Sequence, residues 1–201
     1  MDFTIQEYKN RLHKVQQSMQ KKGIELLISQ DTANIYYLTG YDAWSFYYSQ
    51  CVIIHVNAEE PICYVRAQDA GGALIKTYLK KENIVIYPEK YIHTWPNHPY
   101  DGLVELIKTK KWDKLNIGLE MDSHYFTAFC YEKLRQGLPN ANLKDSERLV
   151  NWVRCIKSET EITYMKNAAV ISEKAMKTAM EVINPGVRPV SYTHLTLPTK
   201  N

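Results

Sequence analysis

Short apolar runs alternate along the chain with longer segments of helical periodicity, and this alternation limits the possible folds more than any other feature. The apolar runs have the length of buried strands and lie at residues 24–28, 51–56, 62–65, 83–87 and 115–119. Apolar residues at three- and four-residue spacing predict helices over residues 4–22, 69–80, 103–111 and 125–134. A turn at 57–61 predicts a hairpin, and residues 142–144 an edge strand. The pattern predicts an α/β domain of three layers, with a mixed β-sheet covered by helices on both faces.

The clearest helix start is Ser158, which Glu161 follows at capping-box spacing. Apolar residues then keep helical spacing up to Asn184-Pro185-Gly186, which predicts a helix of about 25 residues, roughly 37 Å long. Its apolar face needs a partner surface, and little chain follows to supply one. The sequence therefore predicts that a second domain begins with this helix and is missing. Residues 189–201 fit no pattern, so we expect a disordered tail and give His194 no role.

Charge and cysteine usage exclude several classes of protein. The 25 Lys and Arg residues exceed the 22 Asp and Glu residues by only three, which is too few for a nucleic-acid-binding protein. No apolar run approaches the roughly 18 residues of a membrane span, and the N-terminus lacks a secretory signal. Cys51 and Cys63 lie inside apolar runs, where small core residues are expected. We expect a cytoplasmic protein with reduced thiols and neither a nucleic-acid nor a membrane partner.

Motifs for metal binding or catalysis are weak. The six histidines include no pair at the i,i+4 spacing of a helical zinc site, and the closest two, His93 and His98, flank a Trp-Pro pair. We expect no metal site in this chain. The carboxylates Glu120 and Asp122 follow a strand at two-residue spacing, which would suit acid–base chemistry, but helix capping by Asp122 is favoured.

The most promising functional segment is 41–48, which holds five aromatic residues in eight positions. Such rings can close over a small organic cation or anchor a protein partner. Alternatively, Trp44, Phe46 and Tyr48 alternate along an extended chain, so all three could face one side and join the core. The residues alone leave both interpretations open.

Several motifs carry a family resemblance. The segments 34–41 (NIYYLTGY), 117–120 (IGLE), 138–141 (LPNA), 154–162 (RCIKSETEI) and 184–186 (NPG) occur in the order found in the creatinase and prolidase N-terminal domain. The chain resembles this family over roughly residues 8–188. Segments 40–47 (GYDAWSFY), 66–70 (RAQDA) and 149–152 (LVNW) are most similar to its ectoine hydrolase subgroup.

The resemblance implies a two-domain cytoplasmic hydrolase of which this chain is the first part. Residues 1–156 would form the N-terminal domain, residues 157–188 the first helix of a truncated pita-bread catalytic domain, and residues 189–201 a tail foreign to the family. The catalytic groups and, in metal-dependent branches, two divalent metal ions would belong to the missing part. The chain would therefore be the non-catalytic portion of a C–N hydrolase, inactive alone.

The resemblance also implies a role in substrate binding. In creatinase-like homodimers the N-terminal domain closes over the partner's active site, and Phe46 and Tyr48 match substrate-contacting positions, although Tyr48 replaces an arginine. A small zwitterionic or dipeptide-like substrate would bind there, and the candidate substrate-binding residues are Trp44, Phe46, Tyr48, Arg66, Gln68 and His98. The alternatives are the N-terminal domain of a Xaa-Pro dipeptidase, an aminopeptidase or creatinase, and a stand-alone binding or dimerisation module.

Overall fold

A computed structural model describes residues 2–42, 47–183 and 185–186. The chain divides into two compact units, Met1–Cys155 and Ile156–Asn201. The first unit contains the whole sheet, and the second consists, in its described part, of one long helix with its flanking residues.

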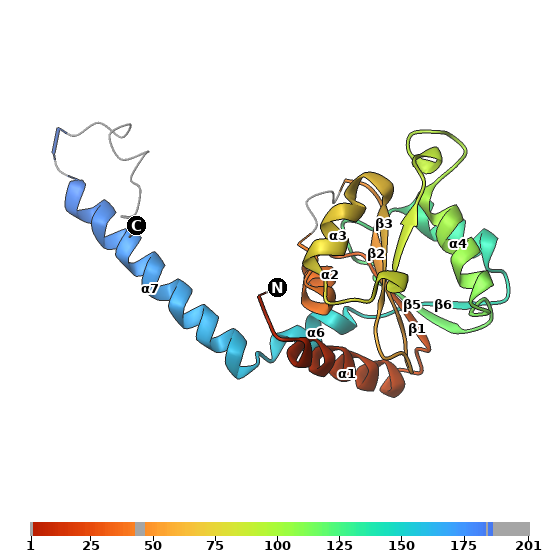
Figure 1. Cartoon of the computed structure of the whole chain (residues 1–201), viewed down its shortest axis with the longest axis horizontal. Helices are drawn as coiled ribbons and strands as arrows, with labels where there is room; N and C mark the ends of the chain where they lie inside the picture. The colour runs from red at the N-terminus through yellow and green to blue at the C-terminus, as the bar shows by residue number, and fades with distance from the viewer. Residues whose placement is uncertain (1, 43–46, 184, 187–201) are drawn as a thin grey trace. The chain divides into compact units, whose positions relative to one another are not determined.

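The first unit is built on one six-stranded sheet of order β4-β3-β2-β1-β5-β6 (Figure 1). The strand β2 runs antiparallel to its neighbours β1 and β3, whereas the pairs β1–β5, β3–β4 and β5–β6 are parallel. The described strands are β1 (Leu26–Ser29), β2 (Cys51–His55), β3 (Ile62–Arg66), β4 (Ile84–Tyr87), β5 (Asn116–Leu119) and β6 (Asn142–Asp145). The mixed sheet and the 57–61 hairpin predicted from the sequence are confirmed.

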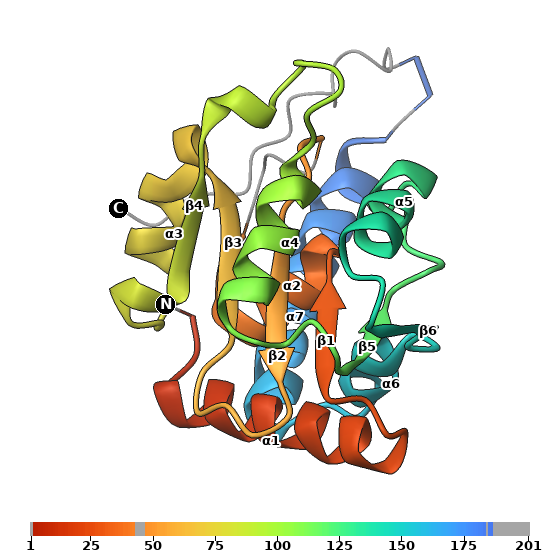
Figure 2. The same ribbon diagram turned by 90° about the vertical axis from the view of Figure 1, so that its right-hand side faces the viewer.

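Two hydrophobic cores form because side chains on a strand alternate between faces. In β1, Leu27 packs on one face, while Leu26 and Ile28 pack on the other. The first core is covered by α1 (Ile5–Lys21), α2 (Thr32–Thr39), α3 (Ala70–Lys76) and α6 (Leu149–Cys155), and the second by α4 (Pro99–Thr109) and α5 (Ala128–Gly137). Figure 2 shows α4 in front of the strands and α2 behind them. The predicted three-layer α/β class is confirmed.

Two details differ from the sequence prediction. No element was expected at residues 34–39, yet α2 forms there because the Asp31 side chain accepts from two amides of its first turn and Gly40, at a φ of 80°, ends it. The predicted helix over 69–80 is shorter, because a 3₁₀ turn (Ala67–Asp69) precedes α3 and Thr77 is extended. Two further 3₁₀ turns span Lys81–Asn83 and Glu89–Tyr91.

The second unit begins with the predicted capping box. The Ser158 hydroxyl accepts from the Glu161 amide at 3.2 Å, and the Glu161 carboxylate accepts from the Ser158 amide at 2.8 Å. The helix α7 that follows spans Glu159–Val182 and leaves large apolar side chains exposed, among them Met165, Ile171, Met176 and Met180. Of the described helices, none has both the length and the apolar character needed to cross a membrane.

Candidate functional site at the carboxyl edge of the sheet

The sheet topology brings the ends of several strands together at one edge. Because β1, β3, β4, β5 and β6 run in one direction and β2 in the other, five of the described strands end where β2 begins. In open α/β sheets this carboxyl edge is the usual place for ligands. Of the predicted site residues, Tyr48 lies just before β2, Arg66 ends β3, and His98 lies in the segment after β4.

A buried carboxylate organises this edge. Glu120, directly after β5, is only 5% exposed and accepts hydrogen bonds from four donors. These donors are the Ser29 hydroxyl at 2.6 Å, the Gln30 amide at 2.8 Å, the Asp31 amide at 3.0 Å and the Asn34 side-chain amide at 2.6 Å. Burial raises the pKa of the Glu120 carboxyl, while the four donors oppose that rise by stabilising the ionised form. Glu120 thus joins the end of β5 to the β1–α2 connection.

Two of the Glu120 partners extend this network. Asn34 also donates to the Asn151 side-chain oxygen at 3.0 Å and accepts from Arg154 at 2.7 Å, which ties α2 to α6. The Gln30 side chain donates to the Tyr100 hydroxyl at 2.7 Å, which ties the same connection to α4. The network therefore spans both helical layers.

The expectation that Asp122 caps a helix is wrong. The following helix, α5, begins at Ala128, and the Thr127 hydroxyl caps it by accepting from the Cys130 amide. Asp122 is exposed and pairs with Arg148. Glu120 is buried among its four donors and Asp122 pairs with Arg148 at the surface, so the two carboxylates have separate partners.

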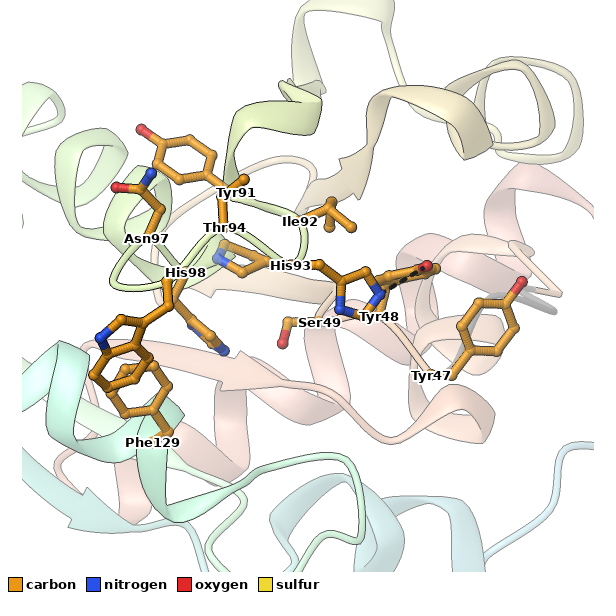
Figure 3. A pocket seen from close by; sticks show the side chains of 12 residues that line it. Tyr47, Tyr48, Ser49, Tyr91, Ile92, His93, Thr94, Asn97, His98 and Phe129 are labelled. Atoms are coloured by element: carbon orange, nitrogen blue, oxygen red, sulfur yellow. Dashed lines mark hydrogen bonds between the residues drawn. The ribbon is translucent and has the colours of Figure 1, made fainter.

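An aromatic cavity of about 430 Å³ opens beside this network. The predicted residues Tyr48 and His98 both line it. Figure 3 shows Tyr47 and Tyr48 on one side, His98 and Phe129 on the other, and His93 between them. The full lining is Tyr47, Tyr48, Ser49, Tyr91, Ile92, His93, Thr94, Trp95, Asn97, His98, Pro99 and Phe129. We call this space the aromatic cavity.

Ring contacts hold the far wall of the aromatic cavity in place. The Trp95 and Phe129 rings stack with their centroids 5.3 Å apart, and the His98 ring meets the edge of Phe129 at 5.1 Å. These contacts join the segment after β4 to the first turn of α5. Trp95 and Phe129 were not predicted from the sequence, although the density of ring residues between Tyr91 and His98 was a usable signal for Trp95.

The other predicted site residues occupy different positions. The Arg66 guanidinium lies 4.1 Å from the Tyr48 ring centroid and forms an ion pair with Glu89 at 2.7 Å, so it packs behind Tyr48 and does not line the cavity. Gln68 lines a separate hollow with Tyr41, Asp42, Tyr47, Asp69, Gly72 and Lys76. Trp44 and Phe46 lie outside the described residues.

His98 combines a structural role with a place in the cavity wall. Its Nδ1 accepts from the Tyr100 amide at 3.2 Å, and Asp101 accepts from the His98 amide at 2.8 Å, which together cap α4. Burial lowers the pKa of the His98 imidazole, and this effect outweighs the nearby Asp101 carboxylate. Because Nδ1 is an acceptor, the neutral ring carries its proton on Nε2.

The two cysteines in the strands are core residues. Cys51 and Cys63 are buried in the two cores as expected, and burial raises the pKa of the Cys63 thiol to about 12. Among residues 2–42, 47–183 and 185–186, no three side chains of His, Cys, Asp or Glu lie together as a metal site would require. The described residues therefore do not fit a pair of divalent ions.

The sheet order and the helical layers on its two faces define a three-layer α/β domain. The sequence profile of the creatinase/prolidase N-terminal domain family matches residues 11–156. The chain belongs to this family, as its motifs indicated.

Individual relatives agree with this assignment. An uncharacterised hydrolase/peptidase of Sinorhizobium fredii is 42% identical over 188 residues, which cover 94% of this chain and 48% of that protein. The ectoine hydrolase of Halomonas elongata is 41% identical over 188 residues, covering 93% and 47%. The Xaa-Pro dipeptidase from Bacillus anthracis shares the fold, with a TM-score of 0.69 at 17% identity over 92% of this chain and 46% of that one. The chain spans about half the length of the curated relatives it matches.

Replacing Glu120 with Gln tests the buried network. The amide nitrogen of Gln would face two donors that now bind a carboxylate oxygen, so we expect the free energy of unfolding to fall by about 2 to 4 kcal/mol. Urea denaturation of both proteins measures this change. Asp122→Asn is the matched control and should cost less than about 1 kcal/mol, because its ion pair is exposed. Equal losses of unfolding free energy in the two variants would contradict the role of Glu120 as the centre of the buried network.

His98 should make the stability of the domain depend on pH. Its pKa is lowered in the folded state, so the unfolded chain binds a proton more readily as the pH falls below the ordinary histidine value of 6.5. The free energy of unfolding should therefore decrease from pH 7 toward pH 5. His98→Asn keeps a capping side chain and should reduce this decrease, whereas the exposed control His124→Asn should not. Identical pH profiles for wild type and His98→Asn would refute the prediction.

Proposed function

We propose that this chain is the N-terminal, non-catalytic portion of an ectoine-hydrolase-like enzyme that cleaves a C–N bond in a small substrate. The chain would contribute one wall of the substrate pocket and part of a homodimer interface. The catalytic groups, and any divalent metal ions, would reside in the region that corresponds to the half of the relatives not covered by this chain. Its domains would be residues 1–156 and, from 157 to 188, the first helix of the catalytic domain.

The observation that carries the proposal is the aromatic cavity at the carboxyl edge in a chain 41% identical to an ectoine hydrolase. The wall is rich in rings and uncharged hydrogen-bonding groups, which suit binding and orientation of a small molecule. By their sequence position, Trp44 and Phe46 would continue this wall beside Tyr48. Ectoine is a zwitterion with a delocalised amidinium, which the rings of Trp44 and Phe46 would stabilise.

Two alternative functions can be distinguished from this proposal by experiments on the isolated chain and on a chimera. A Xaa-Pro dipeptidase, an aminopeptidase or creatinase would use the same fold for a different substrate. A stand-alone binding module would need no catalytic half at all. The exposed apolar side chains of α7 support a protein contact for this helix. Such a contact is expected both for an enzyme and for a stand-alone binding module, so it does not distinguish them.

A chimera tests the proposed function directly. Residues 1–156 of this chain would replace the matching part of the Halomonas elongata ectoine hydrolase. We expect the chimera to hydrolyse ectoine, and the chain of 201 residues to hydrolyse none. In the chimera, Trp44→Ala with Phe46→Ala should raise KM for ectoine about tenfold or more, because two aromatic contacts with the substrate are lost.

The control for this experiment is Trp112→Ala. Trp112 stacks on His55 at the opposite edge of the sheet, so its loss should leave KM unchanged if the fold is retained by circular dichroism. Cleavage of ectoine or a Xaa-Pro dipeptide by the isolated chain would overturn the non-catalytic role. Turnover of a dipeptide in preference to ectoine by the chimera would favour the peptidase rival.

A further inference from the structure

The charge preference of the aromatic cavity is set by groups behind its walls. No Asp, Glu, Lys or Arg side chain is among the described residues that line the cavity. A ligand inside therefore meets rings, hydroxyls, an amide and two imidazoles. Its charge must be matched by hydrogen bonds or by the electrostatic potential at the ring faces.

A cation already sits against a ring on each side of the cavity. The Arg66 guanidinium lies 4.1 Å from the centroid of Tyr48, and the Lys133 ammonium lies 5.3 Å from the centroid of Phe129. A cation at an aromatic ring uses the negative potential of its π system and disfavours a second cation at the same ring. Tyr48 and Phe129 are therefore poor partners for the cationic part of a ligand.

Both cations are fixed in place. Arg66 donates to both oxygens of Glu89, at 3.0 and 2.7 Å, which joins the ends of β3 and β4. Lys133 donates to Asp101 at 2.9 Å and to the Pro96 carbonyl at 2.9 Å. The Arg66 and Lys133 side chains are only 14% and 16% exposed, so neither cation can easily turn away to make room for a ligand cation.

Hydrogen-bond donors in the cavity complement an acceptor instead. The His98 ring uses Nδ1 to accept from Tyr100, which leaves its Nε2–H as a donor. Ser49, from the segment before β2, and Asn97, from the same loop as His98, add polar side chains to the lining. A carboxylate accepts such bonds strongly because charge-assisted hydrogen bonds exceed neutral ones.

We infer that the aromatic cavity binds the carboxylate end of a planar ligand, with His98 as the principal donor and Tyr48 and Phe129 as flanking walls. This inference rests on the proposed function for its biological meaning, because it would orient a zwitterionic substrate with its acid group toward His98. The cationic part would then point out of the cavity. Arg66 becomes a positioning residue for Tyr48 and does not contact the ligand.

Three probes of one shape separate the possibilities: benzoate, benzamide and benzamidine carry negative, zero and positive charge. Nuclear magnetic resonance titration of the 201-residue chain would follow the His98 ring signals. We expect benzoate to bind with a lower Kd than benzamide, and benzamidine to bind at least tenfold more weakly than benzoate. Tighter binding of benzamidine than of benzoate would overturn the inference.

Two further measurements keep the test decisive. Saturating benzoate should raise the pKa of His98, because a bound carboxylate stabilises the imidazolium, and benzamide should not. The variant His98→Ser keeps a capping hydroxyl and should raise the Kd of benzoate at least tenfold. The variant Lys133→Gln removes the cation at Phe129 and should therefore bring the Kd values of benzoate and benzamidine closer together. An unchanged His98 pKa with benzoate would refute the role of His98 even if a variant fails to fold. Ectoine turnover by the chimera is independent of this charge series, so either proposal can fail alone.

Discussion

The carboxyl edge of the sheet depends on one buried carboxylate. Glu120 accepts from two backbone amides of a connection that belongs to no helix or strand, and from the buried side chains of Ser29 and Asn34. A buried amide without a partner costs as much as a lost hydrogen bond, so this connection could not take its present path without an acceptor. Through Asn34 and Gln30 the same carboxylate fixes α2, α6 and α4 relative to the strand ends.

The aromatic cavity is a consequence of this fixed edge. Its residues come from the segment before β2, the segment between β4 and α4, and the first turns of α4 and α5. The cavity walls are held by ion pairs behind them and by ring contacts between them, as for Arg66 with Glu89 and Trp95 with Phe129. A rigid wall can orient a small ligand toward groups supplied by another part of an enzyme.

Much of the fold could be predicted from the sequence because the strands β1, β2 and β3 are buried on both faces and appear as continuous apolar runs. The helix α2 could not, since Asn34, Ile35, Tyr37, Leu38 and Thr39 are all buried and the segment shows no polar stripe. The role of Glu120 was also hidden, because its donors lie 86 to 91 residues away in the chain. For the cavity, the sequence predicted Tyr48 and His98 but not that Arg66 packs behind Tyr48, which depends on the pairing of β3 with β4.

Amide hydrogen exchange at Gln30 and Asp31 tests most directly whether Glu120 holds this edge together. If their amides donate to a buried carboxylate, they should exchange only through global unfolding, at rates like those of the central strand β1. Asn57, an exposed residue in the turn between β2 and β3 whose amide donates to the His55 ring at 3.2 Å, provides the reference for exchange through local opening. Exchange of Gln30 and Asp31 at the rate of Asn57 would contradict the account.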